Sequence, residues 1–192
     1  MINNILLCGV GGQGTVLTSK LIAASAMEKG FSVMSAETIG MAQKGGSVFS
    51  FLRIAQDEEI CTPMFGTGEA DIIIAFEPAE AVRMLPYLKK DGTAIVNSRP
   101  VMPVTAALKA SDYNGREMLD YLGKQVASLT VVDGESICRE LGSPRVLNMV
   151  LLGVAVKSGV LPFTTDDAVE AMKRSVKPQF IELNEKALRG NR

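Results

Sequence analysis

The sequence predicts an α/β fold of three layers, in which a mostly parallel, Rossmann-like sheet carries helices on both faces. Three observations support this prediction. Apolar runs of strand length alternate with helical segments as far as residue 133. A glycine-rich segment follows the first apolar run. The run over 72–76 is continuously apolar and rich in β-branched residues, which is typical of a central strand covered on both faces.

The first strand, the glycines and the first helix form one unit. A strand-length run covers residues 4–8, and a helical segment covers 15–29. Between them, Gly9, Gly11 and Gly14 fit the spacing G-x-G-x-x-G. Such glycines let a phosphate approach the backbone, and the amides at a helix N-terminus attract an anion. Anion binding is one interpretation of this segment; the other is that the glycines only allow strand and helix to pack.

Dinucleotide binding is a narrower interpretation of the same unit. Glu37 lies 23 positions after Gly14, near the offset of about 20 residues at which an acidic residue binds a ribose hydroxyl. Gln13, however, places a bulky amide where a dinucleotide loop does not usually carry one. We expect Gln13 to donate or accept hydrogen bonds instead.

The other elements follow from the same patterns. A second strand is predicted over 31–37, a loop over 38–46, and the two strands of an antiparallel hairpin over 47–54 and 60–62. After the central strand we expect a helix over 79–88, a turn at Asp91–Gly92, a strand over 93–97, a helix over 115–124, a strand over 129–133 and a helix over 135–141. Residues 1–192 are predicted to form a single domain, with an α/β sheet core over 1–143 and a helical C-terminal part over 144–192.

Composition excludes several classes of function. The chain has 192 residues, of which 47% are hydrophobic, so it can bury a sizeable core. A net charge of −1 argues against a nucleic-acid surface or an acidic-membrane patch. The chain contains no histidine, and its three cysteines are far apart, so neither a histidine base nor a clustered metal site is encoded. With no signal-peptide pattern and no long apolar run, we expect a soluble, cytoplasmic protein.

Five ordered motifs carry a resemblance that covers nearly the whole chain. They are the glycine segment 9–14, the segment 37–48 (ETIGMAQKGGSV), 68–71 (GEAD), 76–81 (FEPAEA) and 147–153 (LNMVLLG). With these motifs the chain resembles the gamma-domain family of the thiamine-dependent 2-oxoacid:ferredoxin oxidoreductases, and most of all the small beta subunit of the indolepyruvate enzymes. The family commonly has histidine at the position of Ile39 and arginine at that of Lys44, so a 2-oxoacid other than indolepyruvate stays open.

The resemblance implies a subunit that carries no cofactor of its own. A large alpha subunit would hold thiamine diphosphate and iron–sulfur clusters. The complex would oxidatively decarboxylate an arylpyruvate with coenzyme A and pass electrons to ferredoxin. This chain alone would be inactive, and in isolation it could form a homodimer through the surface meant for its partner.

The predicted site residues lie in two loops at one edge of the sheet, since ligands of open α/β sheets collect at the carboxyl ends of the strands. In the first loop, Gly11, Gly12, Gln13, Gly14 and Thr15 would hold an anionic group such as a phosphate of coenzyme A, or would only pack. In the second, Gln43, Lys44, Gly45 and Gly46 would lie beside it, with Lys44 paired to a carboxylate or phosphate or merely solvated. Glu37 would bond to amides of the first loop or pair with Lys44.

Two other functions remain open from the sequence. The chain could be a free-standing NAD(P)-binding oxidoreductase, because the glycine spacing allows it. It could also be an orphan homologue kept for a different interaction. The absent histidine and the amide at Gln13 favour the oxidoreductase subunit over the nicotinamide enzyme.

Overall fold

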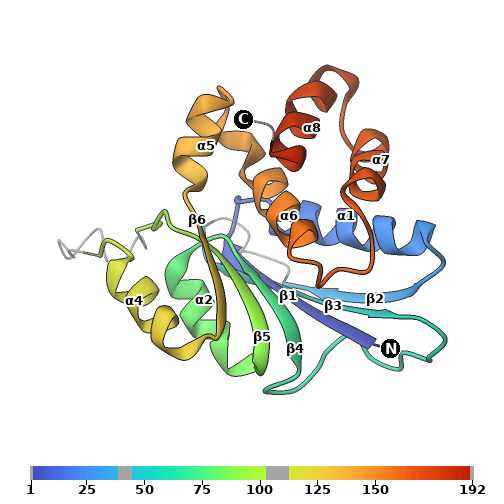
Figure 1. Cartoon of the computed structure of the whole chain (residues 1–192), viewed down its shortest axis with the longest axis horizontal. Coiled ribbons are helices and arrows are strands. Elements are labelled where there is room, and N and C mark those ends of the chain that lie inside the picture. Colours follow the sequence, from blue (N-terminus) through green and yellow to red (C-terminus); the bar gives the residue numbers. More distant parts are fainter. Residues whose placement is uncertain (1, 39–44, 103–112, 191–192) are drawn as a thin grey trace.

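A six-stranded sheet forms the centre of the molecule (Figure 1). The computed structural model describes residues 2–38, 45–102 and 113–190. The strand order is β2-β3-β1-β4-β5-β6. The strands are β1 (Ile2–Val10), β2 (Ser32–Glu37), β3 (Ser47–Ala55), β4 (Ala70–Ala75), β5 (Leu88–Asn97) and β6 (Ser128–Val132). The pairs β1–β4, β4–β5 and β5–β6 are parallel, which confirms the mostly parallel sheet.

The antiparallel part of the sheet is built differently from the predicted hairpin. Strand β3 lies between β2 and β1 and pairs antiparallel with both of them. Residues 60–62 form no strand, so the predicted pairing of 47–54 with 60–62 is wrong. The reason is burial. Side chains of β3 on both faces, such as Phe51 on one and Leu52 and Ile54 on the other, have almost no solvent exposure, as expected of a strand inside the sheet rather than at its edge.

Helices cover both faces of the sheet (Figure 1). One face carries α1 (Thr15–Glu28), α6 (Leu147–Lys157), α7 (Thr165–Ser175) and α8 (Ile181–Arg189). The other face carries α2 (Pro78–Met84) and α4 (Arg116–Gln125). Helix α5 (Gly134–Glu140) comes directly after β6 in the chain. Short 3-10 turns occupy Leu85–Tyr87, Pro144–Val146 and Pro178–Phe180. Among the described residues, no helix is both long and apolar enough to cross a membrane.

Alternation along the strands assigns side chains to the two helix layers. In β1, Ile5 and Leu7 belong to the core under α1 and α6, whereas Leu6 and Cys8 belong to the core under α2 and α4. All four side chains are fully buried. The first strand is therefore covered on both faces, like the central strand β4.

The predicted turn at Asp91–Gly92 is also wrong. Helix α2 ends at Met84, and Asp91 and Gly92 lie inside the long strand β5. The register between β4 and β5 shifts between Ala70 and Ile72, and a Cβ at Gly92 would lie only 3.1 Å from the carbonyl oxygen of Ala70. Gly92 thus permits a close strand contact at an irregularity rather than a chain reversal.

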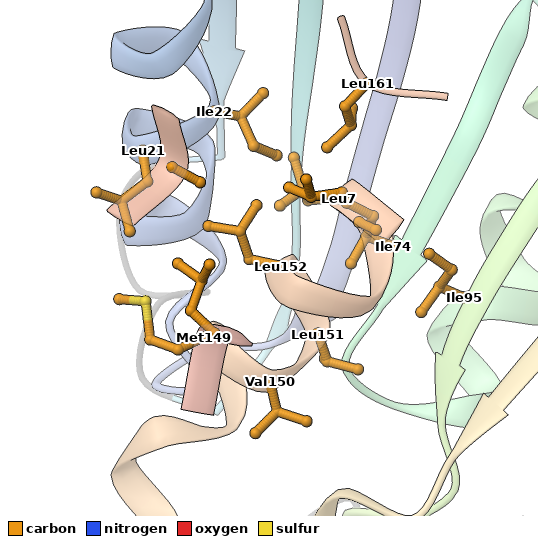
Figure 2. Packing of buried hydrophobic residues seen from close by; sticks show 14 of the residues in the cluster. Leu7, Leu21, Ile22, Ile74, Ile95, Met149, Val150, Leu151, Leu152 and Leu161 are labelled. Carbon is orange, nitrogen blue, oxygen red and sulfur yellow. The ribbon is translucent and has the colours of Figure 1, made fainter. Parts of the chain in front are cut away.

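The C-terminal helices pack into the same core as the sheet. Figure 2 shows Met149, Leu151 and Leu152 of α6 among side chains of α1 and of the strands. These three side chains have no solvent exposure. The uncharged stretch of α6 is therefore core. Helix α7 begins with a capping box in which Thr164 and Asp167 bond reciprocally, as the polar cluster at 164–167 predicts.

We predict that Gly153→Ala strongly destabilises the protein. A Cβ at Gly153 in α6 would lie 2.1 Å from the carbonyl oxygen of Leu188 in α8, so the two helices would have to move apart. Overpacking against backbone should cost at least about 2 kcal/mol, measured by urea denaturation. Gly123→Ala is the matched control, because Gly123 also lies in a helix but its Cβ would meet nothing within 4 Å. The control should be neutral or stabilise by up to about 1 kcal/mol. Equal effects of the two substitutions would contradict the close α6–α8 contact.

Candidate functional site

The N-terminus of α1 opens into a cavity. Gly14 is the N-cap residue with φ 95°, no side chain caps the helix, and the first turn contains no acidic residue. The cavity has a volume of about 290 Å³ and is lined by Gly11, Gly12, Gly14, Thr15, Val16 and Val48. Gly12 has φ 101°, and a Cβ there would meet nothing within 4 Å. The positive end of the α1 dipole is thus left without a compensating side chain, and backbone surrounds it.

The two predicted loops meet at this cavity. The Gly11 N–H donates a hydrogen bond to the carbonyl oxygen of Gly46 at 2.8 Å. Antiparallel pairing of β1 with β3 places Val10 opposite Ser47, so the segment before β3 lies at the carboxyl end of β1. Gly45 and Gly46 are therefore beside the glycine loop. The predicted residues Gln43 and Lys44, and the departure at Ile39, lie outside the described residues.

Gln13 bonds to the protein backbone through both ends of its amide. Its Oε1 accepts a hydrogen bond from the Val10 N–H at 2.7 Å, and its Nε2 donates to the carbonyl oxygen of Phe76 at 3.1 Å. The side chain therefore ties the loop after β1 to the loop after β4. The expected hydrogen bonding of Gln13 is confirmed, and the partners are structural. A ligand contact by this side chain stays a prediction.

The carboxyl ends of β1 and β4 pack closely against each other. Helix α1 leaves β1 toward one face and α2 leaves β4 toward the other, which makes this the point where open α/β sheets bind dinucleotides. Here a Cβ at Gly9 would lie 2.8 Å from both Gln13 Oε1 and the Cβ of Phe76. The Phe76 N–H donates to the Cys8 carbonyl oxygen at 2.8 Å, closing the strands further. Glycine at position 9 therefore permits the close packing of the ends of β1 and β4.

Two buried glutamates at the start of α2 hold the neighbouring segments. Glu77 is 2% exposed and caps α2 by accepting from the Glu80 N–H at 3.0 Å. Its other oxygen accepts from Tyr113 Oη and from the Val101 N–H. Glu80 accepts from Ser47 Oγ, the first side chain of β3. The carboxylates therefore fix the edge of the sheet on which both loops rest.

Sequence reasoning missed this pair of glutamates. The segment Glu77-Pro78 directly after the central strand is the signal that was available, because proline favours the first helical position and an acidic residue before it can cap the helix. The partner residues Val101 and Tyr113 come from distant segments, and no local pattern indicates them.

Burial, together with this cluster, keeps two nearby titratable groups protonated at neutral pH. Burial, with added repulsion from Glu80 and then Glu77, raises the pKa of the Cys8 thiol well above its usual value. Burial and the hydrogen bond to Glu77 also raise the pKa of Tyr113. Both groups therefore stay protonated, and Cys8 is an inert core residue, as the sequence predicts.

Asn148 near the start of α6 is an orphaned polar residue. It is 5% exposed, and a Cβ at Gly14 would lie 3.1–3.3 Å from its side chain. Its Oδ1 is buried and has no hydrogen-bond partner in the part of the chain that the structure describes. A buried amide in this state costs free energy that a bound partner or ligand would recover. The sequence suggests that Asn148 connects its helix to a loop. In the structure this connection is a van der Waals contact between the Asn148 side chain and Gly14 of the glycine loop.

Glu37 and Arg53 lie away from the cavity. Glu37 ends β2, and β3 separates it from β1, so within the described residues it makes no hydrogen bond to amides of the glycine loop. Arg53 Nε donates to Asn4 Oδ1 at 3.0 Å, and the guanidinium pairs with Glu69 at 3.5 Å. These contacts hold the segment between β3 and β4 at the opposite edge of the sheet.

No group of three or more potential metal ligands occurs in the part of the chain that the structure describes. Cys8, Cys61 and Cys138 are all free thiols. The site therefore consists of backbone amides, two structural carboxylates and an orphaned amide, a set that can hold an anionic or polar group.

Comparison with known families identifies the class of protein to which this fold and site belong. Residues 4–190 match the model of the pyruvate ferredoxin/flavodoxin oxidoreductase family, and the chain belongs to that family. The family resemblance predicted from the sequence is thereby confirmed.

Relatives narrow the comparison. The chain is 36% identical to the indolepyruvate oxidoreductase subunit IorB of Archaeoglobus fulgidus, covering 97% of this chain and 92% of the relative. It is 33% identical to the subunit of the same name from Pyrococcus horikoshii, covering 96% and 91%. The pyruvate/ketoisovalerate oxidoreductases common subunit gamma of Pyrococcus furiosus is 28% identical over 96% of this chain and 90% of its own length.

Solved structures share the fold. Pyruvate oxidoreductase subunit PORC from Thermotoga maritima superimposes with a TM-score of 0.71 at 21% identity, covering 98% of this chain and 94% of that one. The 2-oxoglutarate:ferredoxin oxidoreductase of Magnetococcus marinus gives 0.72 at 18% identity, covering 97% of this chain and 30% of that one. In the latter enzyme the fold is one part of a longer chain.

We predict that Gln13→Ala destabilises the glycine loop. The Val10 N–H would lose its acceptor, whereas the Phe76 carbonyl would keep its bond from Asn97 Nδ2. The loss should be about 1–3 kcal/mol by urea denaturation. Gln125→Ala, on the exposed surface of α4, is the control and should change stability little. Similar losses for both variants would show that the Gln13 bridge contributes nothing.

Proposed function

We propose that this chain is the small subunit of a 2-oxoacid:ferredoxin oxidoreductase, and most specifically of an enzyme for arylpyruvates such as indolepyruvate. A large partner subunit would carry thiamine diphosphate and iron–sulfur clusters, and the complex would convert the 2-oxoacid and coenzyme A into an acyl-CoA and carbon dioxide, with ferredoxin taking the electrons. Four relatives at 33–36% identity named indolepyruvate oxidoreductase subunit IorB support the substrate class. The proposal places this complex in the cytoplasm.

The observation that carries the proposal is the cavity at the uncapped N-terminus of α1, joined to the Gly45–Gly46 loop. An anionic group fits there because backbone amides and the helix dipole face it and no acidic side chain competes in the first helical turn. A phosphate of coenzyme A is the group that the family reaction supplies. The orphaned Asn148 amide beside Gly14 supports the same conclusion, since it adds unused hydrogen-bonding capacity.

The chain's own residues would bind and position, and they would do no redox chemistry. Thiamine diphosphate and the clusters supply decarboxylation and electron transfer when bound on the partner. The amides at the start of α1 would hold the phosphate, Gln13 would keep the loop in place, and the Ser47–Glu80 contact would hold the second loop beside it. With no histidine and with Cys8 buried, this division of labour leaves the isolated chain inactive.

The family match and the relatives named as oxidoreductase subunits support the subunit over the nicotinamide alternative. The similar 2-oxoglutarate:ferredoxin oxidoreductase of Magnetococcus marinus has coenzyme A bound, so coenzyme A is the first ligand to test on this chain.

Purification of the tagged chain from its native cell extract tests the subunit assignment. The expected result is a large partner with bound thiamine diphosphate and iron–sulfur absorbance, whose complex oxidises arylpyruvates faster than aliphatic 2-oxoacids. Recovery of this chain alone, or as a homodimer, would count against the assignment. A complex that prefers aliphatic 2-oxoacids would retain the subunit assignment and remove the arylpyruvate specificity.

We predict that Gly12→Asp weakens coenzyme A use by the complex more than Gly12→Asn does. Both replacements carry the same strain at φ 101° and nearly the same shape, so their difference isolates charge at the cavity. A carboxylate beside a bound phosphate should raise the KM for coenzyme A by roughly tenfold relative to the Asn variant. The KM for the 2-oxoacid is the internal control. Equal KM values for coenzyme A in the two variants would rule out an anion in this cavity.

A further inference from the structure

A second pocket lies at the same edge of the sheet, beyond the ends of β5 and β6. Its volume is about 370 Å³, a size suited to a small molecule. The strands β4 and β5 run parallel to β1 and lie between it and β6, so this pocket is separate from the glycine loop. Helix α5, which follows β6 in Figure 1, contributes Gly134, Glu135, Cys138 and Arg139 to the lining of this pocket.

The floor of this pocket is rigid and mostly apolar. Asn97 is 1% exposed, and its amide bonds at both ends, with Nδ2 donating to the Phe76 carbonyl oxygen and Oδ1 accepting from the Gly134 N–H. A Cβ at Gly134 would lie 2.3 Å from Leu147 Cδ1, so the floor is tightly packed. Cys138 is buried beside them, and burial raises the pKa of its thiol. The floor therefore offers mainly shape and apolar contact.

The rim carries two arginines that share one carboxylate. Arg99 Nη1 lies 3.8 Å and Arg139 Nη2 lies 3.5 Å from the same oxygen, Oε1 of Glu135. Both distances exceed those of a good charge-assisted hydrogen bond, about 2.7–2.9 Å. The arginine side chains are 57% and 74% exposed, so these pairs are loose and contribute little to stability. Together the three side chains leave one net positive charge at the rim.

We propose that this pocket binds a small organic anion, a carboxylate or phosphate monoester whose apolar body rests on the Cys138–Leu147 floor. The two guanidinium groups would grip the anionic oxygens in place of Glu135. A guanidinium presents paired N–H donors that match carboxylate and phosphate geometry, and a loosely held internal carboxylate is displaced at low cost. Glu135 is then an internal competitor that occupies the anion position when no ligand is present.

The proposal makes opposite predictions for neighbouring substitutions. Glu135→Gln removes the competitor and should tighten binding several-fold, whereas Arg99→Gln and Arg139→Gln should each weaken it by roughly tenfold. Glu182→Gln is the matched control, since Glu182 forms an exposed i,i+4 pair with Lys186 on α8 and is not among the residues that line the pocket. It should leave the affinity unchanged.

The test is a titration of the ¹⁵N-labelled full-length chain followed by amide chemical shifts. The probes are inorganic phosphate, phenyl phosphate and phenylacetate, which separate the anionic group from the apolar body. We expect saturable shifts at Gly134 and Gly142, with the two phenyl compounds binding more tightly than inorganic phosphate. Absence of saturable shifts there, or a Glu135→Gln variant that binds no more tightly, would overturn the proposal.

The result is independent of the proposed function. The titration needs no partner subunit, and binding to the glycine loop would appear at Gly12 and Gly14 instead. Shifts confined to that loop would support an anion there and would refute the second pocket.

Discussion

The antiparallel pairing of β3 with β1 is the constraint on which the rest of the site depends. It runs without interruption from Ile2 opposite Ala55 to Val10 opposite Ser47. Because the strands run in opposite directions, the segment that enters β3 must lie where β1 ends. That geometry brings the backbone of Gly46 within hydrogen-bond distance of Gly11. A parallel insertion would have placed the second loop at the other edge of the sheet, away from the N-terminus of α1.

Buried polar groups then hold this edge in one arrangement. Glu77 and Glu80 are almost inaccessible to water, and such carboxylates are tolerated only when hydrogen bonds satisfy them. Their partners come from α2, from β3 and from the segments around Val101 and Tyr113. Gln13 adds a bridge between the loops after β1 and β4. Asn148 is the exception in this network, and its unused capacity lies against the glycine at which α1 begins.

Both anion sites that we propose follow from this frame. One uses backbone amides at the end of β1, where charge comes from a helix dipole. The other uses side-chain cations beyond β5 and β6, where the floor is apolar. They lie at the same edge because the strands β1, β4, β5 and β6 are parallel. The two sites are tested in opposite ways. A negative charge added beside the backbone site should weaken anion binding there, whereas removal of the Glu135 carboxylate should strengthen anion binding at the arginine site.

Local pattern alone determined most of the elements of this protein and their order, but not the strand partner of β3 or the extent of β5. The continuous apolar run of β4 marks a strand buried on both faces, the glycines before α1 mark a strand-to-helix turn, and the cluster at 164–167 marks the start of α7. These features depend on contacts between residues close in sequence, so the sequence reports them directly. Five ordered motifs also sufficed to recognise the family, which needs no knowledge of contacts.

Only the tertiary structure decided which distant segments meet. Pairing with β1 positions strand β3, and the sheet makes Asp91 and Gly92 part of a strand. The bonds from Tyr113 to Glu77 and from Gln13 to Phe76 likewise join positions that are far apart in the chain. The shared carboxylate of Arg99 and Arg139 is of the same kind, because 40 positions separate the two arginines in the sequence. The physical reason is that hydrophobic periodicity in the sequence indicates how deeply a residue is buried but not which distant residue it contacts. The neighbour is set by the packing of whole layers, which spans the entire chain.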